Sequence, residues 1–274
     1  MAAPPARTEI SDVYPNPSNA VARTGFGKLW DFVTGLLGLT GLIADARAAL
    51  GFGTGVVLLR TTIYTRVGGV QMVSVDGGTP TSTGATTFTK QAATAFADIE
   101  VQGAGGGSGG NPSTSASQQA FSSGGGGGSN GVGRFTTGLS GITITVGAAG
   151  TAGGAGTAGG NGGSSSAGAL ITAPGGNGSS AGIASGAVAS TGGTSGGALP
   201  TGANILAMQG GPSGTALSAA LGFVTGLAGG LSGAGAPNSY GAGANGKYNG
   251  VSTASPQPGI AAPYDGRVVI KEYA

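Results

Sequence analysis

The sequence predicts short N-terminal α-helices, a small β-region, and a glycine-rich lattice of three-residue-per-turn helices closed by a C-terminal strand. Two observations predict this fold class: an apolar pattern that changes period near Val56, and regular glycine spacing after Gly103. In the passage GAAGTAGGAGTAGGNG, glycine falls at every third residue from Gly147 to Gly162. A period of three fits neither an α-helix nor a strand, but it matches polyproline II geometry, whose backbone polar groups all point outward. A face that carries only glycine lets a neighbouring backbone approach closely and pair with it.

The composition indicates that backbone hydrogen bonds, rather than a large apolar core, hold the glycine-rich part together. The chain has 63 glycines and 13 prolines among 274 residues, yet only 7% of it is charged, whereas disordered chains are usually charge-rich. Ordering a backbone costs roughly 1–2 kcal/mol per residue, and large side chains are few after Gly103. Each backbone hydrogen bond contributes about 0.5–1.5 kcal/mol net. Nearly all of them must therefore form, which favours a dense lattice over a loose coil.

Residues 1–55 are interpreted as a docking and oligomerisation region with two short helices. Ser18 or Asn19 could cap a first helix beginning near Ala20, and a second helix is expected over Ile43–Leu50. Apolar residues recur along the first helix at spacings of three and four, which gives one stripe that two short helices cannot bury alone. The stripe therefore needs a partner, either copies of itself or another protein. The docking and oligomer candidates are Tyr14, Phe26, Leu29, Trp30, Val33 and Leu37.

A β-rich connector is expected over residues 56–102. Its first part, VVLLRTTIYTRVGGVQMVSVDGGTP, is typical of strands, with Asp76-Gly77 as a candidate hairpin turn. The run Thr86–Gln102 predicts another pair of strands.

The glycine-rich domain is expected over residues 103–263, with loops between its glycine runs and one strand-like segment, GITITV, at Gly141–Val146. A closing strand is expected in residues 264–274, where RVVIKEY occupies Arg267–Tyr273. We expect this strand to pair with the strand before Gly103. The glycine region is then a long insertion between two paired strands of a small sheet.

The composition excludes several classes of chemistry. With no histidine and no cysteine, the chain offers no imidazole base, thiolate nucleophile or zinc cluster. Three G-x-S-x-G matches, starting at Gly106, Gly178 and Gly193, follow from glycine abundance, and without histidine they cannot complete a triad. The P-loop-like run that ends in Lys247 has Tyr248 in place of the required Ser or Thr. No cofactor and no metal site are expected.

The charged residues indicate neither an enzyme nor a nucleic-acid-binding protein. Asp98 and Glu100 would lie about 7 Å apart on one strand face, but alternation explains them better as the solvated face of that strand. Between Glu100 and Asp265 the only charged residues are Arg134 and Lys247. This pattern contains no basic footprint for nucleic acid.

Five segments carry a resemblance to phage tail-fibre proteins. The N-terminal YPNPSNAVARTGFGKLWDFVTGLLG with ADARAALG resembles the part that joins such fibres to the virion. The series FTKQAATAFADIEVQGAGGGSGG, GLSGITITVGAAG and DGRVVIKEY resembles the glycine-rich domain near the fibre ends, and is similar to the tip adhesins of T-even phages. This resemblance implies a polyglycine II sandwich, a homotrimer, and attachment of residues 1–55 to a virion tail or to a baseplate or nozzle protein. It also implies loops that contact a host surface glycan or outer-membrane protein, with the protein in the virion tail and exposed extracellularly.

The resemblance directs the search for receptor-contact loops to the segments between glycine runs. The candidate loops are Asn111–Phe121, Leu199–Gln209, Leu217–Leu231 and Pro237–Asn249. Tyr240 and Tyr248 offer flat rings suited to stacking on a sugar or to a protein interface, or they merely cover lattice edges. Phe223 is either part of an exposed apolar patch or part of a small core. The receptor-contact candidates are Tyr240, Tyr248, Lys247, Asn238, Phe223 and Phe121.

Two other functions remain open on the sequence. A structural tail or capsid component could use the glycine lattice as a spacer without any receptor. A cellular glycine-repeat surface protein is the other alternative, because GGAGTAGGNGG resembles mycobacterial glycine-rich families. The sequence has no long shaft and no heptad coiled coil. If the chain is a phage tail-fibre protein, the lack of a long shaft and of a coiled coil favours a stubby tip or nozzle-associated fibre.

Overall fold

The structure is a computed structural model that describes residues 56–186, 189–191, 194–214, 217–219, 240–259 and 263–274. The chain divides into two compact units, Met1–Val57 and Leu58–Ala274, and the second contains all the described residues except Val56 and Val57. The predicted N-terminal helices and all the docking candidates of residues 1–55 lie outside the described residues. Within the described ranges, no helix has the length and apolar character to cross a membrane.

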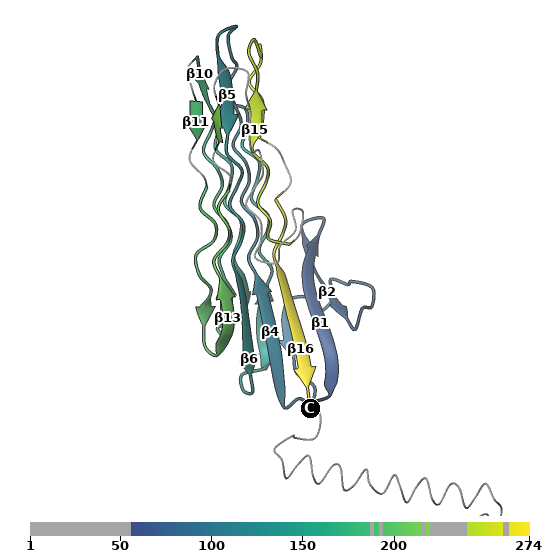
Figure 1. Cartoon of the computed structure of the whole chain (residues 1–274). Helices are drawn as coiled ribbons and strands as arrows, with labels where there is room; N and C mark the ends of the chain where they lie inside the picture. The colour runs from purple at the N-terminus through teal and green to yellow at the C-terminus, as the bar shows by residue number, and fades with distance from the viewer. Residues whose placement is uncertain (1–55, 187–188, 192–193, 215–216, 220–239, 260–262) are drawn as a thin grey trace, which may run out of the picture. The chain divides into compact units, whose positions relative to one another are not determined.

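One end of Leu58–Ala274 is a sandwich of two antiparallel sheets (Figure 1). The six-stranded sheet has the order β13-β6-β4-β16-β1-β2. Its strands are β13 (Ile205–Gln209), β6 (Asn130–Phe135), β4 (Phe96–Gln102), β16 (Arg267–Tyr273), β1 (Leu58–Val67) and β2 (Val70–Val75). The five-stranded sheet has the order β12-β9-β8-β7-β3. Its strands are β12 (Thr201–Gly202), β9 (Ile171–Ala173), β8 (Ser165–Ala167), β7 (Ser140–Thr145) and β3 (Thr87–Thr89).

Two smaller antiparallel sheets form at the opposite end of the same unit, which is called the loop end below (Figure 1). The three-stranded sheet has the order β10-β5-β15, with β10 (Ile183–Ser185), β5 (Gln119–Ser122) and β15 (Lys247–Asn249). The two-stranded sheet pairs β11 (Ala189–Thr191) with β14 (Leu217–Ala219). Wavy glycine-rich segments connect the sandwich to the loop end.

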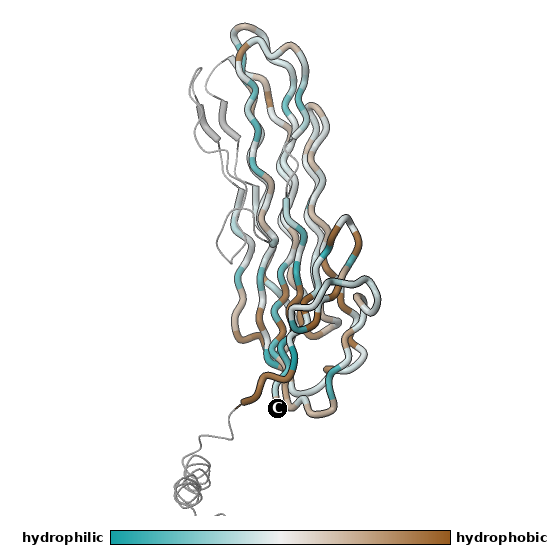
Figure 2. The backbone as a smooth tube through the Cα atoms, turned by 90° about the vertical axis from the view of Figure 1, so that its right-hand side faces the viewer, coloured by the Kyte–Doolittle hydropathy of each residue, from teal (hydrophilic) through white to brown (hydrophobic). Residues whose placement is uncertain are grey.

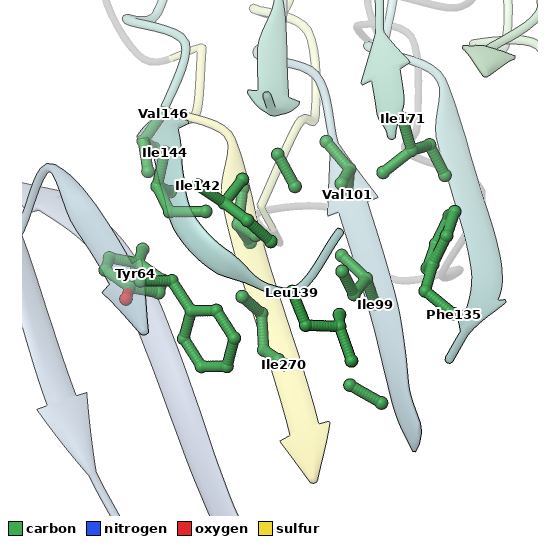
Figure 3. Packing of buried hydrophobic residues seen from close by; sticks show 14 of the residues in the cluster. Tyr64, Ile99, Val101, Phe135, Leu139, Ile142, Ile144, Val146, Ile171 and Ile270 are labelled. Carbon is green, nitrogen blue, oxygen red and sulfur yellow. The ribbon is translucent and has the colours of Figure 1, made fainter. Parts of the chain in front are cut away.

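The side-chain core lies between the two sheets of the sandwich (Figure 3). Alternation along β4 explains its formation: Ala97, Ile99 and Val101 are fully buried on one face, while Asp98 and Glu100 stay partly exposed on the other. The facing sheet contributes apolar side chains from β7 and β9. The largest members of the core are Tyr64, Phe88, Ile99, Phe135, Leu139, Ile142, Ile144, Ile171 and Ile270. The hydrophobic colour in Figure 2 is accordingly strongest around these strands, and the connecting segments are mostly pale.

The closing strand lies inside the six-stranded sheet. β16 pairs antiparallel with β4, from Arg267 opposite Gln102 to Tyr273 opposite Phe96, and on its other side it pairs with β1. The predicted pairing of the terminal strand with the strand before Gly103 is thus confirmed. The predicted strand in GITITV is confirmed as β7.

Two tight turns shape the β1–β2 region. Gly68 and Gly69, with φ of 57° and 81°, join β1 to β2, as a two-residue turn of type I′ requires. The predicted turn at Asp76-Gly77 also forms, with φ of 49° and 77°, and brings Thr81 back to pair with Val73. The turn at Asp76-Gly77 was predicted from the sequence, and the turn at Gly68-Gly69 was not.

The predicted fold class is wrong. The described residues contain no α-helix, and they form a six-, a five-, a three- and a two-stranded antiparallel sheet rather than one small β-region. Strands occur at both ends of the glycine-rich segments and not only at Gly141–Val146. The physical reason is that residues with side chains flank each glycine run. At these flanking residues the backbone stops donating hydrogen bonds to neighbours in three directions and instead pairs with strands in one sheet.

Candidate functional site: the glycine lattice and its loop end

The central thread, residues 103–110, is the inner element of the glycine-rich part, and every one of its residues is buried. Its N–H donors rotate among neighbours with a period of three residues. The N–H groups of Gly103 and Gly106 donate to the carbonyls of Ser129 and Gly126, each over 2.8 Å. The N–H groups of the residues that follow them, Ala104 and Gly107, donate to carbonyls of a different neighbouring segment, residues 157–163, over 3.0 and 2.9 Å. Three directions per turn is the geometry of a left-handed three-residue helix.

The carbonyl groups of the central thread point to further neighbours. Ala104 accepts from Gly176 over 2.8 Å, and two residues later Gly106 accepts from Ala244 over 2.9 Å. The central thread is therefore enclosed by other threads whose side chains take little part in the bonding. The central thread, its direct neighbours and the outer segments 194–200 and 210–214, which bond to those neighbours, form the glycine lattice. The direct neighbours are residues 123–129, 146–153, 157–164, 174–182, 241–246 and 263–266.

Close approach of the threads requires glycine at specific positions. A Cβ added to Gly107 would overlap the carbonyl oxygen of Thr151 and lie 2.6 Å from its carbonyl carbon. A Cβ added to Gly106 would likewise overlap the carbonyl oxygen of Asn177. Real Cβ atoms essentially never approach within 3.0 Å of such atoms. These positions exclude every side chain because the neighbouring backbone fills the space.

The passage from Gly147 to Gly162 forms two threads rather than one. The chain reverses at Gly156, whose φ is +70°, so that residues 157–164 return beside 146–153. At Gly147 and Gly162 of the period-three series an added Cβ would overlap a carbonyl oxygen, of Gly163 and Ala104 respectively. Apart from the turn residue Gly156, which has open space beside it, the period of three seen in the sequence thus marks positions that face another backbone.

Two loops meet at the loop end and form one surface. The first tip loop (112–118) precedes β5, and the second tip loop (250–256) follows β15; together they are called the tip pad below. Thr114 N–H donates to the Thr253 carbonyl and Ser252 N–H donates to the Ser115 carbonyl, each over 2.9 Å. Thr114 Oγ1 also donates to the Gly250 carbonyl over 2.5 Å. These bonds hold the two loops in one arrangement before any partner binds.

The candidates Phe121, Tyr248 and Lys247 lie directly beneath the tip pad. Phe121 is fully buried, and its ring stacks on that of Tyr248, with centroids 5.6 Å apart. Tyr248 is half-buried, and its hydroxyl donates to Gln119 Oε1 over 3.2 Å. Lys247 is half-buried at the start of β15. The stack supports the pad from below.

Tyr240 lies apart from Tyr248, so the predicted loop Pro237–Asn249 is not a single contact loop. The stretch between the two tyrosines, 241–246, is a thread of the lattice and mostly buried. At about 3.1 Å per residue, such a thread places the tyrosines roughly 25 Å apart along its axis. Tyr240 stays 39% exposed beside the sandwich, where the guanidinium of Arg267 lies 5.1 Å from its ring centroid.

The remaining receptor candidates divide between other places. Asn238 and Phe223 lie outside the described residues. Of the candidate loops, Leu199–Gln209 contributes β12 and β13 to the sandwich, and Asn111–Phe121 contains the first tip loop. The candidate Leu217–Leu231 begins with β14 and otherwise lies outside the described residues. The second tip loop was missed, although its Gly-Val-Ser-Thr-Ala-Ser-Pro sequence carries the polar and proline signals typical of loops.

The carboxylates of β4 are each paired with an arginine of a neighbouring strand. Asp98 accepts from Arg134 Nε and Nη2 over 2.7 and 2.8 Å, and Glu100 accepts from Arg267 over 3.1 Å. The bond to Asp98 raises the pKa of the Arg134 guanidinium above its usual value. Among the described residues, no three His, Cys, Asp or Glu side chains gather into a group able to hold a metal ion.

A fully buried carboxylate occurs within the sandwich. Glu272 of β16 forms an ion pair with Arg60 of β1, and its Oε1 accepts from Gln91 N–H and Thr94 Oγ1, each over 2.7 Å. Burial raises the pKa of the nearby Tyr64 hydroxyl to about 12, with the Arg60 charge opposing this shift and Glu272 adding to it. These groups hold β1, β16 and the segment before β4 together.

The described residues define a class of β-protein in which a backbone-bonded glycine lattice separates a sandwich from a loop end. Residues 80–267 match the family described as "Glycine-rich domain". Because the match covers more than half of the chain, the chain belongs to this family. No curated protein matches the chain.

Proposed function

We propose that this chain is a tip protein of a phage tail fibre, which attaches to the virion through residues 1–55 and contacts a host-cell receptor with its tip pad. One observation carries the proposal: two exposed loops are bonded to each other at the end of a rigid lattice, opposite the sandwich. Loops positioned by a rigid scaffold are common binding surfaces. The resemblance of residues 1–55 to fibre attachment regions supports the virion end of the proposal.

The pairing of the loops favours binding over a spacer role. A spacer needs only the lattice, whereas the bonds of Thr114 and Ser252 join two loops that lie beyond the described lattice segments. Pre-organised loops lose less conformational entropy on binding. Homotrimers, repeated on a virion, would multiply weak contacts by raising their effective concentration.

The proposal is tested by adsorption competition with the full-length chain. Purified protein is added to host cells before challenge with the phage that encodes it. We expect dose-dependent loss of adsorption. A protein that is folded by circular dichroism, yet neither binds cells nor blocks adsorption, would contradict receptor binding and favour the spacer. Light scattering of the same sample measures whether the chain is a trimer.

A further inference from the structure

The tip pad is chemically unusual for a binding surface because it carries no charge. The loops read PSTSASQ at 112–118 and GVSTASP at 250–256. Residues 136–246 also contain no charged side chain, so segments of this stretch outside the described residues add none. Among the residues that the structure describes, Lys247 is the single charged residue next to the pad, and it is half-buried. Whatever binds the pad meets hydroxyls, backbone and small apolar groups.

The tip pad also lacks the kinds of side chain that usually bind a sugar. Neither tip loop contains an aromatic residue. The ring of Tyr248 beneath them is covered on one face by Phe121, and Gly250 lies against its hydroxyl end. Two planar amides at the pad are partly engaged within the protein: Gln118 Oε1 accepts from Ser115 N–H over 3.3 Å, and Asn249 Nδ2 donates to the Pro112 carbonyl over 3.0 Å.

Small hydroxyl residues and one apolar side chain remain on the surface. Ser113, Ser115, Ser117, Ser252 and Ser255 are exposed, and Val251 is 50% exposed. Serine and glycine supply adaptable hydrogen bonds in protein-recognition loops, and an exposed valine adds apolar contact. A charged partner would lose hydration at this surface without gaining an opposite charge.

From these observations we infer that the tip pad binds an uncharged polypeptide segment of the receptor, and neither a glycan nor an anionic surface polymer. This inference rests on the proposed function, because it names the ligand class of the same surface. It replaces the expected stacking of Tyr240 and Tyr248 on a sugar with hydrogen bonding by the tip loops.

The experiment measures binding of the labelled full-length chain to host cells at about 20 mM and about 500 mM salt, where charge interactions are respectively long-ranged and screened. Separate cell samples are treated with protease or with periodate, which destroys sugar diols. We expect binding to change less than about twofold with salt, because no charge pair contributes. Protease treatment should abolish binding and periodate should spare it.

Variants in the tip pad provide the second arm of the experiment. Ser117→Glu and Ser117→Lys place opposite charges on one exposed residue, and each should weaken binding about tenfold because a buried unpaired charge of either sign is unfavourable. The matched control is Thr137→Glu, an exposed position in the β6–β7 turn at the sandwich end, which should bind like the unmodified chain.

The outcomes separate this inference from the proposed function. Binding that is lost with periodate, falls at least about tenfold in high salt, or is strengthened by Ser117→Lys would overturn the neutral polypeptide ligand while leaving receptor binding intact. Equal effects of Ser117→Glu and Thr137→Glu would overturn the tip pad as the contact surface. If the unmodified folded chain binds no host cells, receptor binding and this inference both fail.

Discussion

The glycine lattice and the sandwich lie in the same unit, but they bury their backbones with different atoms. In the sandwich, alternating side chains such as Ile99 and Ile144 fill the space between two sheets. In the lattice, the space beside Gly107 is filled by the carbonyl group of Thr151. Close packing of the sandwich thus requires large side chains, whereas close packing of the lattice requires positions without a side chain.

This difference teaches how each region should respond to substitution. A side-chain core can partly collapse around a missing methyl group or shift rotamers around an extra one. The lattice has no rotamers at the contact, because both surfaces are backbone whose hydrogen bonds fix their separation. The lattice should therefore tolerate less added volume than the core, although it contains far fewer large side chains.

The largest effect is expected for Gly107→Ala in the central thread. The new Cβ would overlap the carbonyl of Thr151, so two threads must separate and lose backbone hydrogen bonds. Overpacked side-chain cores usually lose about 1–3 kcal/mol, and we expect this variant to lose more than about 4 kcal/mol or to fail to fold. Chemical denaturation or thermal melting measures the loss.

The matched control for that variant is Gly210→Ala. Here the nearest atom to an added Cβ is the Gly197 carbonyl oxygen at 3.4 Å, an ordinary contact, and φ is not positive. The control should stay within about 1 kcal/mol of the unmodified chain, since replacing glycine also reduces the entropy of the unfolded state. Equal losses for the two variants would show that the separation of the threads is not set by backbone contact.

The second largest effect is expected for Glu272→Ala in the sandwich. The change leaves Arg60 without its partner and removes the acceptor for Gln91 N–H and Thr94 Oγ1. Breaking a buried ion pair by removing one member costs about 3–5 kcal/mol. Asp98→Ala is the control, because its pair with Arg134 is exposed to solvent, and exposed ion pairs contribute little to stability. A Glu272→Ala loss no larger than that of Asp98→Ala would contradict this assignment.

An intermediate effect is expected for alkaline pH, acting through Tyr64 of the sandwich. Its pKa is about 12 in the folded chain against about 10 in an unfolded one. Because the folded pKa is raised, the associated stability is complete below pH ~10 and is lost as the pH rises towards ~12, by about 2–3 kcal/mol in all. The free energy of unfolding, measured across this range, should fall less steeply for Tyr64→Phe. Identical slopes would rule out Tyr64 as the titrating group.

The sequence predicted the parts of the fold that carry strong local patterns. The apolar alternation of Arg267–Tyr273 and of GITITV identified β16 and β7, and the pairing of β16 with β4 followed from their positions around the glycine region. Strands such as β6 (Asn130–Phe135) were missed. Its sequence, NGVGRF, places glycine on the buried face, where Phe135 and Pro200 occupy the space that side chains at Gly131 and Gly133 would need.

The candidate site was harder to predict because the same residue types occur in threads and in loops. The stretch GAGANG between Tyr240 and Tyr248 has the composition of a flexible loop, yet it bonds to residues of the central thread and of 123–129. Whether such a stretch is a thread depends on neighbours distant in the sequence. The loops that do reach the surface differ from threads mainly by serine, threonine and proline, a weak signal in a chain with this composition.

The smallest effect is expected for Ile144→Val, which removes one methyl group from the core of the sandwich. Ile144 is 2% exposed, and such a deletion costs about 0.5–1.5 kcal/mol. The control Ile183→Val removes the same group from a side chain that is 74% exposed, and it should change the unfolding free energy by less than about 0.5 kcal/mol. Both are measured by denaturant titration beside Gly107→Ala, which adds one methyl group. If removing a methyl group from the core costs as much as adding one to the central thread, the two regions respond alike, and the contrast between side-chain and backbone packing fails. A several-fold larger loss for the added methyl group would instead show that the spacing of the lattice is set by its backbone.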